Sequence, residues 1–211
     1  MTAEDRSVQG STRDRLLAAG LRLFAERGYR STTVGDIEQA AGLQPRRGAL
    51  YKHFASKQAL LEAAARRHVD AVAEAGRRVV DAPADDVGQE ARLLGQWLLG
   101  ELDAEHDLVR VLEQDGDRLP TLRDAARVGI SDHGYQAVAA LLGRWLGNRA
   151  ADVDLDAVAV VLLGPLINHR RSGWTFGAAP LGLDDRRVVE AWADVCELFV
   201  RSHGEGPPVG G

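Results

Sequence analysis

Two helix-start signals of the same kind stand near the beginning of this chain and restrict its fold more than any other feature. Ser11 is followed three residues later by Asp14, and Thr33 is followed in the same way by Asp36. In such a pair, each side chain can accept a hydrogen bond from the backbone amide of the other residue. Apolar residues recur at helical intervals behind each signal, and a glycine closes each segment. The pattern predicts two consecutive helices, at about 11–28 and 33–41.

Composition extends this prediction to the rest of the chain. Alanine, leucine, arginine and glutamate are abundant, runs of β-branched residues are scarce, and aromatic residues make up only 5% of the sequence. These preferences favour helices over strands, and we predict an all-α fold of about nine helices. After the first two, the helices are expected at about 45–54, 56–81, 86–102, 107–114, 121–146, 154–171 and 184–203.

The segment GLQPRRGALYKHF, residues 42–54, combines a helix-start signal with paired positive charge. Pro45 suits the first turn of a helix because its missing N–H would have no partner there. A helix from Pro45 to about Phe54, behind a glycine turn and a short helix, has the layout of a helix-turn-helix, whose second helix enters the DNA major groove. Leu43, Leu50 and Phe54 would seat this helix on the preceding two.

The outer side of this predicted recognition helix and the residues just after it carry the candidate DNA contacts. They are Gln44, Arg46, Arg47, Gly48, Tyr51, Lys52, His53 and Lys57. The two arginines are the candidate base readers, because arginine can hold guanine through two hydrogen bonds. Gly48 would let the backbone approach the groove closely, and Tyr51 and Lys57 can donate to phosphate oxygens. His53 can either donate to a phosphate or pack into the small core.

Charge is distributed unevenly along the chain. Residues 1–67 hold 12 Lys and Arg against 7 Asp and Glu, a net charge of +5, and residues 68–211 hold 14 against 24, a net charge of −10. This asymmetry suggests a nucleic-acid-facing module joined to a part that does not touch the polyanion, although chance clustering would look the same. A single cysteine, a polar N-terminus and the lack of a run of about 20 apolar residues favour a cytoplasmic protein without a membrane partner.

The longest continuous motif covers residues 13–69 and contains LLAAGLRLFAERGYRSTTVGDIEQAAG followed by GALYKHFASKQALLEA. This motif resembles the DNA-binding domain of TetR-family transcriptional regulators. The resemblance implies contacts to the DNA backbone from Thr33, Tyr51, His53 and Lys57. In one place the chain departs from the family, which most often has five residues where this chain has the seven of LQPRRGA. Two additional residues would lengthen the turn or the front of the recognition helix.

The resemblance also implies a domain organisation. TetR-like proteins pair the DNA-binding domain with a helical domain that binds an effector and forms a homodimer through its last two helices. The expected parts are a disordered N-terminus at 1–10, a DNA-binding domain at 11–67 with its helix-turn-helix at about 33–54, a ligand-binding and dimerisation domain at 68–203, and a disordered tail at 204–211.

Apolar stripes on the last two predicted helices provide a candidate dimer interface. Its residues are Val161, Leu162, Leu166, Trp192, Val195 and Phe199. A core face and a dimer face look alike in a sequence pattern, so both roles stay open. The candidate effector pocket is drawn from sparse aromatic and imidazole side chains: Trp97, His106, Tyr135, Trp145 and Trp174. Core packing is the alternative for each of them.

No Walker loop, Rossmann glycine motif or nucleophile–base grouping is evident. We therefore expect no catalytic residue, no cofactor and no metal site. The resulting hypothesis is a homodimeric transcriptional regulator, most simply a repressor, that binds a double-stranded DNA operator and is released by a small organic effector. Two alternatives stay open. One is a DNA-binding dimer without an effector, and the other is a small helical enzyme whose basic domain serves a different anion.

Overall fold

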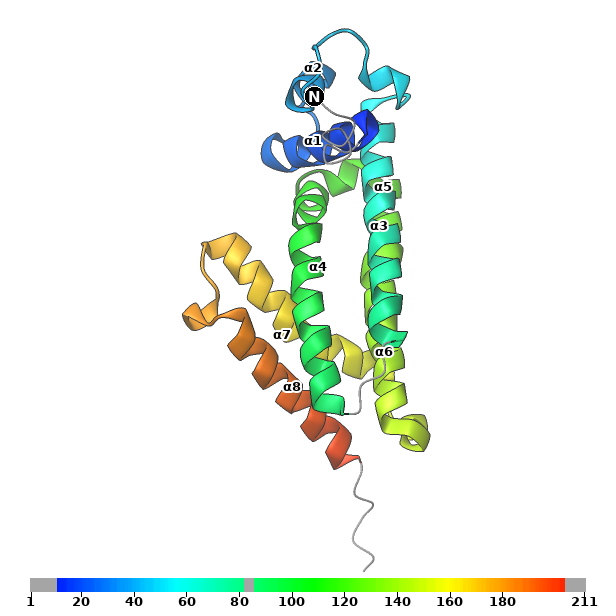
Figure 1. Cartoon of the computed structure of the whole chain (residues 1–211), viewed down its shortest axis with the longest axis vertical. Coiled ribbons are helices and arrows are strands. Elements are labelled where there is room, and N and C mark those ends of the chain that lie inside the picture. Colours follow the sequence, from blue (N-terminus) through cyan, green and yellow to red (C-terminus); the bar gives the residue numbers. More distant parts are fainter. Residues whose placement is uncertain (1–10, 82–85, 204–211) are drawn as a thin grey trace, which may run out of the picture. The chain divides into compact units, whose positions relative to one another are not determined.

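The computed structural model describes residues 11–81 and 86–203, apart from the side chains of residues 75–76 and 78–81. These residues are helical except for turns and loops, which confirms the all-α prediction (Figure 1). The α-helices are α1 (Thr12–Arg27), α2 (Val34–Ala40), α3 (Lys57–Asp81), α4 (Val87–Asp115), α5 (Pro120–Ala126), α6 (His133–Leu146), α7 (Leu155–Phe176) and α8 (Asp185–Ser202). The two ends expected to be disordered, 1–10 and 204–211, lie outside the described residues.

The chain forms two compact units. Within the described residues, the first unit takes in the chain up to Ala71 together with Glu105–Arg127, and the second takes in Val72–Ala104 and the chain from Val128 onward. Helices α3 and α4 therefore contribute residues to both units. The domain boundary expected between residues 67 and 68 stays a prediction.

Both helix-start signals operate as the sequence predicts. Ser11 Oγ accepts from the Asp14 amide at 3.2 Å, while Asp14 Oδ2 accepts from the Ser11 amide at 3.0 Å. Thr33 and Asp36 form the same reciprocal pair ahead of α2. Behind these caps, the core of the first unit contains the fully buried side chains Leu16, Phe24, Ile37, Leu50, Leu60 and Leu61.

The predicted recognition helix from Pro45 to Phe54 is wrong. The segment is a loop that ends in one 3₁₀ turn, Leu50–Lys52. Arg46 and Gly48 have φ values of 63° and 69°, in the left-handed region that a right-handed α-helix excludes. In the segment 11–54, the structure thus has α1, α2 and a structured loop where three helices were predicted.

The second unit is held together by apolar contacts among α4, α6, α7 and α8. Helices α7 and α8 lie side by side (Figure 1). The buried Trp192 ring of α8 packs into the core, and its Nε1 donates to the Leu162 carbonyl of α7 at 2.7 Å. At the start of α8, Asp185 accepts two hydrogen bonds from Arg170, at 2.9 and 2.8 Å. These contacts fix how α8 lies against α7.

The expected break between helices at 102 and 107 is also wrong, because α4 runs without interruption from Val87 to Asp115. The charged residues that interrupt the apolar pattern have partners. Asp103 lies 3.0 Å from Arg170, and Glu105 lies 3.7 Å from His68. In the expected helix 121–146, a π-helical segment at Arg127–Asp132 separates α5 from α6.

Candidate DNA-binding surface and ligand pocket

Helix α2 begins at a polar cap on the surface of the first unit. Thr33 is exposed, and its hydroxyl accepts from the Asp36 amide at 3.2 Å and donates to Asp36 Oδ2 at 2.6 Å. The hydrogen bonds that the Asp36 carboxylate accepts from the Thr33 hydroxyl and the Thr33 amide lower its pKa below its ordinary value. The Thr33 hydroxyl hydrogen therefore already has an acceptor, and its expected contact with the DNA backbone stays a prediction.

Helix α2 ends in a Schellman motif. Gly42 has a φ of 71°, its amide donates to the Gln39 carbonyl at 3.0 Å, and the next amide, that of Leu43, donates to the Glu38 carbonyl at 2.8 Å. Glycine suits the first position because it adopts a positive φ without steric cost. The motif ends α2 and directs the chain into the loop 43–49.

The loop is organised by a buried acidic side chain that the sequence analysis did not single out. Glu38 has no solvent exposure, and its two carboxylate oxygens accept from the amides of Arg46, at 2.8 Å, and Leu50, at 3.0 Å. The sequence contained one signal for this role, which is that Glu38 stands next to Ile37 on the buried side of a short helix. A carboxylate is rarely buried without a partner, so this position implies nearby hydrogen-bond donors.

The candidate base-reading residues lie on the exterior of this loop. The exposed side chains are Gln44, Arg46, Arg47, Tyr51, Lys52 and His53, and Tyr51 is 60% exposed. Gly48 is partly exposed, whereas Leu50 and Phe54 are buried and seat the segment as expected. A β-carbon at Gly35 would lie 3.9 Å from Arg46 Cγ and 3.8 Å from Thr33 Oγ1. The structure thus brings the stem of Arg46 and the cap of α2 onto one surface.

Lys57 is engaged inside the first unit. Its Nζ donates to the carbonyls of Tyr29, at 2.5 Å, and Thr32, at 2.8 Å, and lies 4.3 Å from the centre of the Tyr29 ring. Burial lowers the pKa of Lys57, although the Asp115 carboxylate opposes this shift. Two of the three ammonium donors are occupied, so Lys57 holds the turn between α1 and α2, and its expected phosphate contact stays a prediction.

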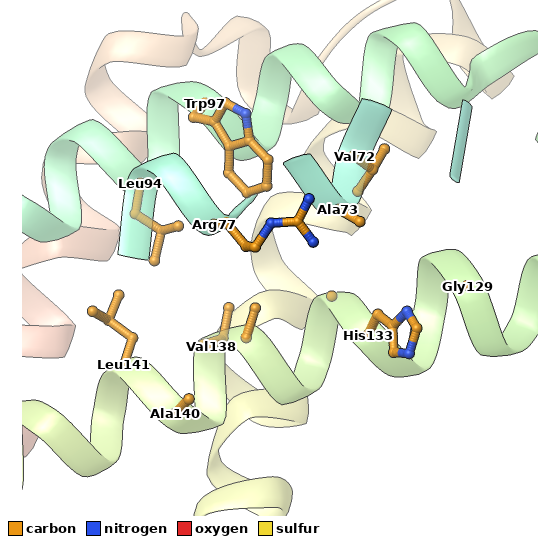
Figure 2. A pocket seen from close by; sticks show the side chains of 12 residues that line it. Val72, Ala73, Arg77, Leu94, Trp97, Gly129, His133, Val138, Ala140 and Leu141 are labelled. Atoms are coloured by element: carbon orange, nitrogen blue, oxygen red, sulfur yellow. The ribbon is translucent and has the colours of Figure 1, made fainter. Parts of the chain in front are cut away.

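The second unit contains a cavity of about 360 Å³ with a mainly apolar wall (Figure 2). It is lined by Val72, Ala73, Arg77, Leu94, Trp97, Gly129, His133, Gly134, Ala137, Val138, Ala140 and Leu141. Figure 2 shows Trp97 and Arg77 on one side, with Val138 and His133 of α6 opposite them. The indole Nε1–H of Trp97 is buried and has no hydrogen-bond acceptor among the described residues.

Of the five side chains proposed for the pocket from sequence, only Trp97 lines this cavity. Tyr135 and Trp145 pack against the core of the second unit, and Trp145 Nε1 donates to the buried Glu90 carboxylate. His106 belongs to the first unit, and Trp174 lies near the end of α7. The lining residues that were missed are mostly small or aliphatic, and such residues give no signal in a sequence that distinguishes a cavity wall from a packed core.

The candidate dimer residues separate into two groups. Leu162, Leu166 and Trp192 are buried within the second unit, and Phe199 is partly buried against the same core. Val161 is 70% exposed, and Val195 is also exposed. Two further exposed apolar side chains, Val160 of α7 and Leu198 of α8, were not named from the sequence. Together, Val160, Val161, Val195 and Leu198 form an exposed apolar set on the paired helices.

The described part of the chain contains no group of three or more His, Cys, Asp or Glu residues placed to hold a metal ion. Among those same residues, no helix combines the length and the apolar character needed to cross a membrane.

The fold and the exposed basic loop define a class: an all-helical chain whose N-terminal unit has the helix-and-turn layout of DNA-binding regulators. Residues 16–64 match the family model described as bacterial regulatory proteins, tetR family. The chain is 34% identical over 113 residues to the HTH-type transcriptional repressor KstR2 of Rhodococcus jostii, and these residues make up 54% of each chain. It is 40% identical over 60 residues to the HTH-type transcriptional regulator AcrR of Shigella flexneri, covering 28% of this chain and 27% of that one. The chain thus spans about half the length of the repressor relative, and less of the other.

Solved structures match over a greater length. The TetR-family transcriptional regulator PfmR of Thermus thermophilus superposes with a TM-score of 0.64 at 25% identity, covering 86% of this chain and 96% of that one. The fatty acid degradation regulator FadR of Bacillus halodurans superposes with a TM-score of 0.66 at 20% identity, covering 89% and 95%. These likenesses show the fold, and the family match shows a segment of the tetR family at residues 16–64.

Proposed function

We propose that this protein is a sequence-specific DNA-binding transcriptional regulator that works as a homodimeric repressor and is released by a small organic effector. The observation that carries the proposal is the exposed pair Arg46 and Arg47, held on a structured loop within the segment that matches the tetR family. Exposed arginines on a fixed backbone can hold guanine edges through paired hydrogen bonds. The basic first third of the chain supplies the charge that attracts DNA phosphates.

The test begins with selection of bound duplexes from a random pool, followed by measurement of Kd for a selected and a scrambled duplex at several salt concentrations. Arg46→Ala and Arg47→Ala should each reduce the preference for the selected duplex by roughly 5- to 150-fold, the worth of one bidentate base contact. Gln136→Ala, at an exposed position on α6, is the control. If the wild-type protein prefers no duplex at low ionic strength, the proposal is wrong.

We propose dimerisation through α7 and α8 on the basis of their exposed apolar set. Exposed apolar side chains concentrated on adjacent helices are typical of a subunit interface, and a two-fold axis would double the buried area. A homodimer can also place two reading loops in successive major grooves roughly 34 Å apart. The double variant Val161→Glu, Val195→Glu should sediment as a monomer and lose affinity for the selected duplex. A dimer that survives this change would exclude this face.

The cavity of the second unit is our proposed effector site. Its wall is mainly aliphatic and aromatic, and Arg77 and His133 are its charged or polar members. A mainly apolar molecule would fill this space, because ligand sites with aliphatic and aromatic walls bury the apolar surface of what they bind. Release of DNA requires that the effector bind the DNA-incompatible form more tightly than the DNA-compatible form.

We propose no catalytic activity for the chain, and its site of action would be the cytoplasm, where bacterial operators lie. The related proteins are named as transcriptional regulators or repressors, which supports the first statement. A turnover assay on every compound that stabilises the protein checks the proposed lack of catalytic activity. Conversion of any of these compounds would favour the enzyme alternative.

A further inference from the structure

We infer that Glu38 is a positioning residue for DNA reading, which acts through the backbone of the loop 43–49 and has no contact with DNA itself. The inference rests on the proposed function, because it explains how this chain presents its reading arginines without a recognition helix. The same residue binds the loop at three points. Its carbonyl accepts from the Leu43 amide at 2.8 Å, and its carboxylate accepts from the amides of Arg46 and Leu50.

The three contacts are spread over the whole loop. Leu43 begins it, Arg46 lies in its middle, and Leu50 begins the 3₁₀ turn that follows. A carboxylate has two oxygens that accept independently, so one side chain can replace the amide partners that a continuous helix would have supplied. The Leu50 amide is buried, so without the Glu38 carboxylate its N–H would lose this acceptor in the interior of the unit.

The backbone conformation of Arg46 gives the second argument. Arg46 has a φ of 63°, which is uncommon for a residue that carries a β-carbon and persists only where the surroundings fix it. The contact that fixes it is the hydrogen bond from its own amide to Glu38 Oε2. Without that bond, the residue would relax toward negative φ, which turns its side chain to a different direction. The direction of the Arg46 guanidinium is thus linked to a side chain on α2.

The burial of Glu38 separates this role from a direct contact. A fully buried carboxylate cannot meet a base edge or a phosphate, and as an anion it would be repelled by DNA if it were exposed. The seven residues of LQPRRGA provide the length that lets the chain leave α2, pass over Glu38 and return at Leu50. The length of the loop and the Glu38 contacts therefore act together to fix the path of the loop.

The experiment compares Glu38→Gln with Glu26→Gln in the full-length protein. Glu26 is an exposed carboxylate on α1 of the same unit, so both variants remove one negative charge, but only Glu38→Gln removes a loop acceptor, since the amide nitrogen of glutamine cannot accept. The measured quantity is the ratio of Kd values for a scrambled and a selected duplex. We expect Glu38→Gln to lower this ratio at least about tenfold, comparable with loss of one bidentate base contact.

Three further readouts separate positioning from general destabilisation. The slope of affinity against salt concentration should stay within about one unit of the wild-type slope, because no phosphate contact is lost. Glu38→Gln combined with Arg46→Ala should lose little more preference than Arg46→Ala alone, since both act through one side chain. Duplexes selected anew with Glu38→Gln should differ at the positions that Arg46→Ala changes. An unchanged ratio, or an equal loss of affinity for both duplexes, would overturn the inference.

Amide hydrogen exchange in the wild-type protein decides the case even if Glu38→Gln does not fold. The Arg46 and Leu50 amides should be protected, whereas those of Arg47 and Ala49 should exchange quickly. Uniform protection of the amides from 46 to 54 would indicate a helix and overturn the inference, as would fast exchange at both Arg46 and Leu50. A wild-type protein without duplex preference would instead defeat the proposed function and leave this exchange pattern intact.

Discussion

The two units of this protein carry their candidate sites on different kinds of support. In the first unit, the exposed loop that bears Arg46 and Arg47 is held by individual hydrogen bonds from Glu38 and follows the capped helix α2. In the second unit, the cavity beside Trp97 is bounded by apolar packing of α4 and α6. A surface that must present side chains in fixed directions needs directional contacts, whereas a cavity for an apolar molecule needs only volume and shape.

The difference predicts different sensitivities to substitution. Where single hydrogen bonds fix a loop, losing one acceptor alters direction and specificity while much of the stability is retained. Where packing maintains a cavity wall, losing side-chain volume lowers stability and losing cavity volume abolishes binding. Four measurements can contradict or refine this contrast.

The largest expected effect is on the core of the second unit. Trp192→Ala should lower the free energy of unfolding by about 3–5 kcal/mol, because it leaves a large cavity where the indole packs between α7 and α8. Trp192→Phe, which keeps most of the packing but loses the bond to the Leu162 carbonyl, should cost only about 1 kcal/mol. Urea denaturation measures both. Equal losses for the two variants would mean that the hydrogen bond, and not packing, supports this unit.

The next effect concerns the volume of the cavity. In the wild-type protein, a compound found by thermal-shift screening should stabilise the fold by about 2.7 kcal/mol at one hundred times its Kd. Ala137→Trp should remove this stabilisation by filling the cavity, while operator binding persists and no longer responds to the compound. Gln136→Trp places the same ring at the exposed neighbouring position and should respond normally. Compound-dependent stabilisation that survives Ala137→Trp would exclude this cavity as the effector site.

A smaller effect is expected at the cap of α2. Thr33→Ala should lower the free energy of unfolding of the first unit by about 1 kcal/mol, since the first turn of α2 loses its side-chain acceptor. Thr33→Ser keeps the hydroxyl and should behave like the wild-type protein. Thermal denaturation followed by circular dichroism measures the loss. If Thr33 also meets a phosphate, Thr33→Ala should weaken binding to the selected and the scrambled duplex by a similar factor, with little change in the salt slope because the hydroxyl carries no charge.

The smallest effect is a pH dependence at the start of α8. Hydrogen bonds from Arg170, and then from His169, lower the pKa of Asp185 below 3.8 in the folded state. The unfolded chain then binds the proton more readily, so the stability contributed by Asp185 is complete above about pH 4 and is lost as the pH falls through the lowered value. Because the side chain is half exposed, the contribution is at most about 1 kcal/mol. The stability difference between wild type and Asp185→Asn should shrink from pH 5 to pH 3, and a constant difference would contradict this origin.

Local signals predicted the helices well. The capping boxes at Ser11 and Thr33 are present, and Gly28 and Gly42 follow the last turns of α1 and α2. Each of these features involves residues within four positions of one another, so the sequence contains both partners of the contact. The exposure of Arg46 and Arg47 and the burial of Leu50 also agree with the sequence analysis.

The prediction failed where a distant partner competed with a local preference. Pro45 indicated a helix start. The amides of Arg46 and Leu50, which would have been part of that helix, instead donate to Glu38, which lies 8 positions before Arg46 and 12 positions before Leu50. A break was expected between residues 102 and 107, but α4 continues there, and Asp103 and Glu105 pair with residues elsewhere in the sequence. The cavity could not be placed for the same reason, because its wall combines residues from Val72 to Leu141.

The sequence by itself determined the helical class, the caps, the basic character of the first third and the segment that carries the reading arginines, because each depends on composition or on neighbours along the chain. Tertiary structure alone decided that this segment is a loop, which apolar residues stay exposed on α7 and α8, and where the cavity lies. Those features depend on which distant groups satisfy buried amides and fill space, and a one-dimensional pattern does not contain that information.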